Sequence, residues 1–185
     1  MRVFISSVTA RLKDERHDLA ALLAVMESYE PVQFEDFGAQ DRSSRDACLG
    51  GVRSSDVYVL LLGPVYGQRW VDSNLAATEE EFALARKLGK PILAFVKATD
   101  EADEPDQAAF KRHVEGYVGG RFRASFTDSQ SLNLAVVAAL RGLHTDSDAV
   151  QWERLDPPAT VQWRWETPLL SSETNFASAL CVNLG

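Results

Sequence analysis

The chain has few of the residues that metal sites and disulfide-rich secreted proteins require. It contains two cysteines in 185 residues, Cys48 and Cys181, and neither belongs to a pair with metal-ligand spacing. We therefore expect reduced thiols and a cytoplasmic protein. The three histidines, His17, His113 and His144, are scattered, with no cysteine or second histidine nearby, so we expect no metal site.

Positive charge and long apolar runs are also scarce. The 19 Lys and Arg residues are outnumbered by 27 Asp and Glu residues, which gives a formal net charge of −8. This balance argues against non-specific binding to nucleic acid or to an anionic membrane, and leaves open only a local basic patch. No run approaches the roughly 18 apolar residues of a membrane span, and the first residues form an apolar strand pattern, not a signal peptide.

Several catalytic and nucleotide-binding fingerprints are absent. The sequence has no glycine-rich P-loop, no Gly-x-Gly-x-x-Gly and no nucleophile elbow. Phosphoacceptor receiver domains need acidic residues after the first strand and at the end of the third. This chain has Ser6-Ser7 and Leu62-Gly63 at these places, which excludes that class.

What the chain does have is an alternation of short apolar runs with helical patterns. We expect strands over residues 3–5, 31–34, 56–63, 91–96 and 122–126, and helices over residues 9–27, 43–53, 78–88, 107–117 and 132–143. The run 56–63 is continuously apolar, as in a central strand covered on both faces. The alternation predicts an α/β, flavodoxin-like fold with a five-stranded parallel sheet, order 2-1-3-4-5, and helices on both faces.

This strand order predicts where a ligand binds. The first and third strands are neighbours whose chains leave in opposite directions, and ligands bind in the crevice outside their carboxyl ends. The residues expected there are Ser6, Ser7, Gly63, Tyr66 and the first turn of the third helix with Glu79, Glu80 and Glu81. Ser6 to Thr9 either bond a phosphate or cap the first helix. Trp70 and Tyr66 either wall a base-binding pocket or cover the end of the sheet.

The three adjacent glutamates have two interpretations. Thr78-x-x-Glu81 fits a capping box, in which Thr78 bonds the N–H of Glu81 and the Glu81 side chain returns to the N–H of Thr78. Alternatively, Glu81 places a carboxylate in the crevice, where it can stabilise an oxocarbenium-like ribose while a base departs. The residues alone leave both interpretations open.

The pattern changes beyond about residue 145. Pro157-Pro158 breaks the chain, and Val161, Trp163 and Trp165 alternate as one face of a strand would. We expect a domain over residues 1–145 and a C-terminal extension, or the start of a further segment, over residues 146–185.

Four motifs carry a resemblance to a known family. They are Val3-Phe4-Ile5-Ser6-Ser7, Glu35-Asp36-Phe37-Gly38-Ala39, Ser55-Asp56-Val57-Tyr58-Val59-x-x-x-Gly63-x-x-Tyr66-Gly67 and Thr78-Glu79-x-Glu81-Phe82-x-x-Ala85-x-x-x-Gly89-Lys90-Pro91. Together they resemble the TIR-like domain of unknown function, an N-terminal module of NACHT-type ATPases and other multidomain proteins. The last motif is also similar to nucleoside deoxyribosyltransferases, in which the glutamate is the nucleophile.

The resemblance implies a TIR-related fold and a nucleotide ligand. TIR domains either cleave NAD at the nicotinamide glycosidic bond or assemble through homotypic contacts. On this match Glu81 is the catalytic candidate and Glu79 the neighbouring alternative. Phe4, Ser6 and Ser7 would line the nucleotide crevice, and residues 35–40 would form a mobile loop over it.

Two functions of different class follow. The first is an NAD glycohydrolase in bacterial defence or signalling, with NAD as substrate, no separate cofactor, and a crevice that includes Gly63, Tyr66, Trp70 and Glu79. The second is a non-catalytic adaptor module that self-associates. In both cases we expect self-association and neither nucleic acid nor membrane as a partner.

Overall fold

The computed structural model describes residues 1–36, 38, 41, 43–118 and 123–153. Residues Met1–Ser147 form one compact unit. The strand predicted around Trp163 and Trp165 lies outside the described residues, as does most of the predicted extension over residues 146–185. The boundary after residue 145 therefore stays a prediction.

Five parallel strands form a single sheet in the order β2-β1-β3-β4-β5, which confirms the predicted topology. The strands are β1 (Arg2–Ser6), β2 (Glu30–Val32), β3 (Val57–Leu62), β4 (Ile92–Lys97) and β5 (Arg123–Phe126). Phe4 lies opposite Tyr58, and Tyr58 lies opposite Ile92, so the carboxyl ends of β1, β3 and β4 meet at one edge.

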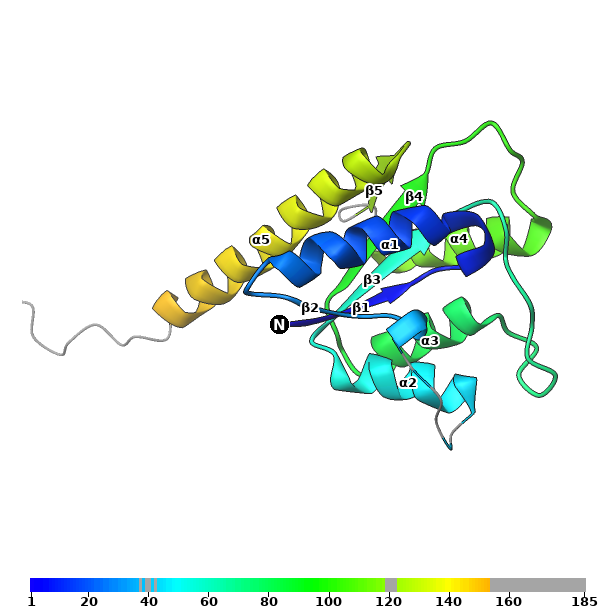
Figure 1. The fold of residues 1–185 in the computed structure, drawn as a ribbon, viewed down its shortest axis with the longest axis horizontal. Coiled ribbons are helices and arrows are strands. Elements are labelled where there is room, and N and C mark those ends of the chain that lie inside the picture. Colours follow the sequence, from blue (N-terminus) through cyan, green and yellow to red (C-terminus); the bar gives the residue numbers. More distant parts are fainter. Residues whose placement is uncertain (37, 39–40, 42, 119–122, 154–185) are drawn as a thin grey trace, which may run out of the picture. The chain divides into compact units, whose positions relative to one another are not determined.

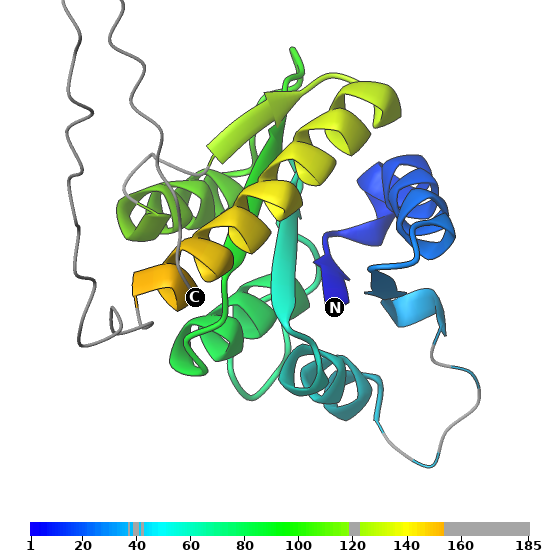
Figure 2. The same ribbon diagram turned by 90° about the vertical axis from the view of Figure 1, so that its left-hand side faces the viewer.

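Helices cover both faces of this sheet, as the alternation predicts. They are α1 (Thr9–Val25), the 3-10 turn η1 (Phe34–Asp36), α2 (Ser44–Ser54), α3 (Ala77–Lys87), α4 (Pro105–Val118) and α5 (Ser129–Glu153). Helices α1 and α5 pack on one face, and α2, α3 and α4 pack on the other (Figures 1 and 2).

Strand β3 is buried along its whole length and supplies both core layers. Val57, Val59 and Leu61 pack with α1 and α5, whereas the residues between them pack with α2, α3 and α4. A strand with helices on both faces has no solvent-facing side, which explains its unbroken apolar run.

Several predicted boundaries are wrong, most of all the end of the last helix, which lies at Glu153 and not at residue 143. Two others have a clear local reason. Phe34 is not part of the second strand, because Asp36 accepts a hydrogen bond from the Gln33 N–H and closes the turn η1. The last helix begins at Ser129 rather than residue 132, because Asp128 accepts from the Ser131 N–H at 2.8 Å and caps it. Helix α2 begins after Ser43, whose hydroxyl accepts a hydrogen bond from the Asp46 N–H at 3.0 Å and caps the helix.

Candidate active site

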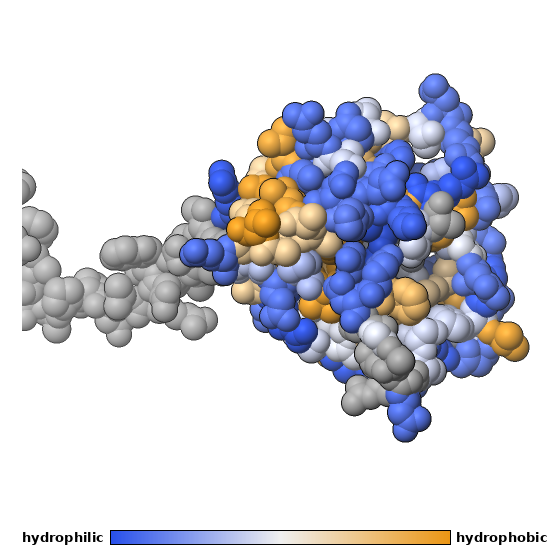
Figure 3. Space-filling view, viewed as in Figure 1, coloured by the Kyte–Doolittle hydropathy of each residue, from blue (hydrophilic) through white to orange (hydrophobic). Residues whose placement is uncertain are grey.

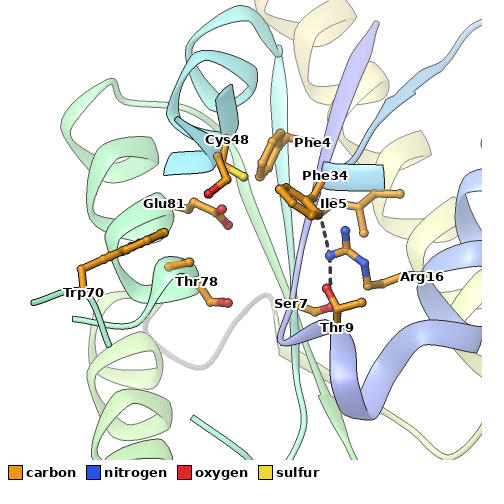
Figure 4. Close-up of a pocket in the computed structure, with 12 residues that line it drawn as sticks. Phe4, Ile5, Ser7, Thr9, Arg16, Phe34, Cys48, Trp70, Thr78 and Glu81 are labelled. Carbon is orange, nitrogen blue, oxygen red and sulfur yellow. Dashed lines mark hydrogen bonds between the residues drawn. The ribbon is translucent and has the colours of Figure 1, made fainter. Parts of the chain in front are cut away.

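A cavity of about 200 Å³ opens at the carboxyl end of β1 (Figure 4). Residues from β1, the turn after it, α1, η1, α2, the loop after β3 and the first turns of α3 form its wall. The lining residues are Phe4, Ile5, Ser7, Thr9, Arg16, Phe34, Ser44, Cys48, Trp70, Ala77, Thr78 and Glu81. The cavity therefore lies at the predicted switch point.

Glu81 is the acidic residue of this wall. It lies near the N-terminal end of α3, is 6% exposed, and accepts a hydrogen bond at Oε2 from the Ser6 hydroxyl at 2.5 Å. Ser6 is the last residue of β1 and is fully buried. The contact joins the end of the first strand to the helix that follows the third, across 75 residues of sequence.

The predicted capping box is wrong. Helix α3 begins at Ala77, and its N-cap is Ala76, which makes no side-chain capping bond. Thr78 is therefore already inside the helix and is buried in the cavity wall. The Glu81 carboxyl bonds Ser6 instead of the Thr78 N–H, because β1 brings a buried hydroxyl within reach.

The three adjacent glutamates point to three different partners. Glu79 accepts a hydrogen bond from the Tyr66 hydroxyl. Glu80 pairs with the Arg45 guanidinium through both of its oxygens. Only Glu81 of the three lines the cavity.

Burial raises the pKa of Glu81 to about 7. The hydrogen bonds from Ser6 and Cys48 and the positive charge of Arg16 act in the opposite direction and favour the carboxylate. The same surroundings raise the pKa of the Cys48 thiol to about 12, through its own burial and then the neighbouring Glu81 charge. The cavity thus contains a carboxyl whose ionisation can change near neutral pH, beside a thiol that stays protonated.

Arg16 is the cation of the wall. It is 3% exposed, and its Nη1 donates to the Ile5 carbonyl at 3.2 Å and to the Ser7 hydroxyl at 3.1 Å. Its Nε and Nη2 form a bidentate pair with Glu35 in η1. A signal for this placement exists in the sequence, since position 16 falls on the same helical face as Leu12 and Leu19.

The predicted site residues fall into two groups. Phe4, Ser7, Trp70 and Glu81 line the cavity, and Ser6 lies directly behind Glu81.

The others lie apart from this wall. The Gly63 carbonyl accepts a hydrogen bond from Gln107, and Tyr66 packs edge-to-face against Phe110 in the core. These two residues and Glu79 are not among the lining residues, and their binding roles stay predictions.

Arg16, Phe34 and Cys48 are wall residues that sequence reasoning missed. Cys48 carries no distinguishing sequence signal, because an isolated cysteine in a helix looks like any small core residue. The sequence pattern predicts that Phe34 belongs to a strand. Within the described part of the chain, no cluster of side chains could hold a metal ion, and no helix is long and apolar enough to cross a membrane.

The raised pKa of Glu81 predicts a pH-dependent stability. Its ordinary pKa is 4.5, so between the two values the folded state binds more protons than the unfolded state, and stability falls as pH rises. We expect the free energy of unfolding to lose about 2 kcal/mol from this group between about pH 5 and pH 7. Urea titrations at several pH values measure the effect.

The matched variants for this prediction are Glu81→Gln and Glu80→Gln. Glu81→Gln removes the buried titrating group, so the free energy of unfolding of this variant should not decrease in this way between about pH 5 and pH 7. Glu80→Gln removes one charge from the neighbouring position and should keep it. Parallel pH profiles for wild type and Glu81→Gln would contradict the prediction.

Comparisons with known proteins place the chain in a family. The family model described as "Domain of unknown function (DUF4062)" matches residues 2–141. The chain belongs to this family. No curated protein sequence matches this DUF4062 domain significantly.

Solved structures similar to this DUF4062 domain include two nucleotide- or nucleoside-processing proteins. One is the CMP N-glycosidase BcmB from Clostridium botulinum, with 13% identity, a TM-score of 0.48, and coverage of 75% of this chain and 99% of that one. The other is a 2-desoxiribosyltransferase from Leishmania mexicana, with 18% identity, a TM-score of 0.41, and coverage of 53% and 65%. Both TM-scores are below 0.5, so the fold rests on the strand order and the proposed function on the residues of the site.

Proposed function

We propose that this DUF4062 domain cleaves the N-glycosidic bond of a nucleotide, with NAD as the leading candidate substrate. The observation that carries the proposal is Glu81. A buried carboxyl, held by Ser6, faces a cavity at the switch point of the sheet. A perturbed carboxyl in such a cavity is the kind of group that active sites use.

The chemistry needs a carboxylate beside the anomeric carbon. As the bond from C1′ to the base nitrogen breaks, the electron pair leaves with the base and positive charge develops on the ribosyl ring. Ionised Glu81 stabilises that charge, and a water molecule then adds to C1′ and releases one proton. With NAD the pyridinium nitrogen keeps the electron pair, so nicotinamide departs as a neutral molecule and ADP-ribose remains.

The cavity suits the ribosyl part of such a substrate. Phe4, Phe34 and Trp70 give apolar walls, and the hydroxyl residues Ser7 and Thr78 line the same space. Its volume of about 200 Å³ is below the roughly 300–1,000 Å³ of pockets for whole drug-sized ligands. We therefore place the sugar and the scissile bond inside the cavity and the remaining phosphates outside it. The buried position of Glu81 also strengthens its interaction with a ribosyl cation.

The proposal includes a relationship to TIR domains and a role in bacterial defence or signalling. Self-association of the domain stays a prediction. The most exposed large hydrophobic side chains lie on separate elements: Val25 on α1, Val71 after β3 and Leu134 on α5. The face of the molecule seen in Figure 3 is largely hydrophilic, with small hydrophobic patches. Because homotypic assembly could complete a site, protein concentration is a variable of the test.

The test is release of free base from nucleotides. Purified protein is incubated with NAD, with pyrimidine nucleoside monophosphates and with deoxynucleosides, over a wide range of protein concentration, and products are separated by chromatography. We expect nicotinamide and ADP-ribose in equal amounts from NAD. If every nucleotide keeps its base even at the highest protein concentration, the proposed function is wrong.

A further inference from the structure

Ser6 differs from the other polar residues of this site because it is entirely enclosed. It is 0% exposed, lies opposite Leu60 in the strand ladder, and directs its hydroxyl to Glu81 Oε2 at 2.5 Å. It is not among the residues that line the cavity. A substrate in the cavity therefore meets Glu81 and not Ser6.

We infer that Ser6 is a positioning residue for Glu81, whose hydroxyl holds one carboxylate oxygen and keeps the carboxylate turned toward the cavity. The inference rests on the proposed function and replaces the expectation that Ser6 contacts the nucleotide itself. A hydrogen bond to an ionised group is about twice as strong as one between neutral groups. Supporting residues of this kind fix the geometry of a reacting group when they lie on rigid elements, and β1 is such an element.

Other groups that face Glu81 do not substitute for this hydroxyl. The guanidinium N–H groups of Arg16 from α1 donate to Ile5, Ser7 and Glu35. The Cys48 thiol from α2 lies against the carboxyl, but a thiol is a weak donor. The Tyr58 hydroxyl from β3 donates to the Thr78 carbonyl, and Glu80 from α3 repels the ionised form of Glu81.

Loss of the Ser6 hydroxyl should therefore act through the ionisation and orientation of Glu81. Because the hydroxyl favours the carboxylate, its removal raises the pKa of Glu81, which burial already holds at about 7. The loss of one hydrogen bond to a charged group changes the pKa of that group by about one unit. At a pH at or below the pKa of Glu81, a rise of one unit in this pKa lowers the ionised fraction about five- to tenfold.

The experiment compares Ser6→Ala with Ser55→Ala. Ser55 is a matched control because it is also buried and donates to a backbone carbonyl, that of Gly51, away from the cavity. In Ser6→Ala we expect kcat for base release to fall at least fivefold at pH 7 and KM to stay within a factor of two. Because the carboxylate of Glu81 is the active form, kcat should increase with pH, and in Ser6→Ala this increase should occur about one pH unit higher than in wild type. Ser6→Thr, which keeps the hydroxyl, should restore the profile. Ser55→Ala should leave it in place.

A second measurement is independent of turnover. Carbon-13 NMR of the side-chain carboxyls in wild type and Ser6→Ala follows the Glu81 titration directly, with Glu81→Gln identifying the resonance. An upward displacement in Ser6→Ala but not in Ser55→Ala supports the inference even if Ser6→Thr does not fold. An unchanged titration in Ser6→Ala overturns it. If the Ser6→Ala substitution raises the pKa of Glu81 but the wild-type protein releases no base, the proposed function fails while the contact between Ser6 and Glu81 stands.

Discussion

Glu81→Gln is expected to reduce the rate of base release by about 10³-fold or more, which corresponds to about 4 kcal/mol of lost transition-state stabilisation. The amide keeps the shape of the side chain, and its oxygen can still accept the Ser6 hydrogen bond. What the variant lacks is the negative charge that stabilises a ribosyl cation. The measurement is kcat/KM for base release, with circular dichroism to show that the variant is folded.

Glu79→Gln and Glu80→Gln are the matched controls for this prediction. Each removes one charge from the same turn of α3, but Glu79 bonds Tyr66 and Glu80 pairs with Arg45. Both variants should keep kcat within a few-fold of wild type, whereas the binding role predicted for Glu79 would show as a raised KM in Glu79→Gln alone. Equal losses in all three variants would mean that the net charge of the turn, and not the carboxylate at the cavity, governs activity.

The rate of the wild-type protein should also rise with pH through the titration of Glu81. The carboxylate is the active form, and burial raises the pKa of Glu81 to about 7, so the rate increases as pH passes through this value and levels off above it. The residual rate of Glu81→Gln should show no such limb. A wild-type rate that falls as pH rises through 7 would instead indicate a protonated Glu81 acting as an acid.

The layered fold is predictable from the sequence because the apolar runs report burial directly. The run from Val57 to Leu62 can be continuous only where helices cover both faces, and that condition determines much of the architecture. Helix ends are less predictable, because a cap depends on local competition. Thr78 is a suitable N-cap by residue type, yet the helix starts one residue before it, at Ala77. Asp128 caps α5, although Ser129 and Ser131 beside it are also suitable N-caps by residue type.

The site is only partly predictable because its key contacts join distant segments. The switch point and the acidic first turn of α3 follow from strand order, but the sequence cannot distinguish three adjacent glutamates by their partners. Ser6 is 75 residues away from Glu81, and no local pattern pairs them. The helical position of Arg16 does indicate its role, since a charged residue on an apolar helix face requires buried polar partners.

Arg16→Met is expected to lower the free energy of unfolding by about 3–4 kcal/mol. The substitution keeps an unbranched chain in the buried position but leaves the Ile5 carbonyl, the Ser7 hydroxyl and the Glu35 carboxylate without this donor. The Glu35 side chain is 38% exposed and can be hydrated again, so the cost stays near the lower end for a broken buried pair. Urea unfolding at neutral pH measures it.

Two further variants separate the parts of this loss. Lys13→Met removes an exposed positive charge from the same helix and should change stability by less than about 0.5 kcal/mol. Glu35→Gln keeps an oxygen acceptor for Arg16 and should lower the free energy of unfolding by less than Arg16→Met does.

Burial raises the pKa of Glu35, but the hydrogen bonds and charge of Arg16 outweigh burial and hold the pKa below its ordinary value. Ionised Glu35 therefore stabilises the fold above its unfolded pKa, and this stabilisation is lost as pH falls through its lower folded-state pKa. If Arg16→Met were as stable as Lys13→Met, the polar contacts of Arg16 would not stabilise the wall of the cavity.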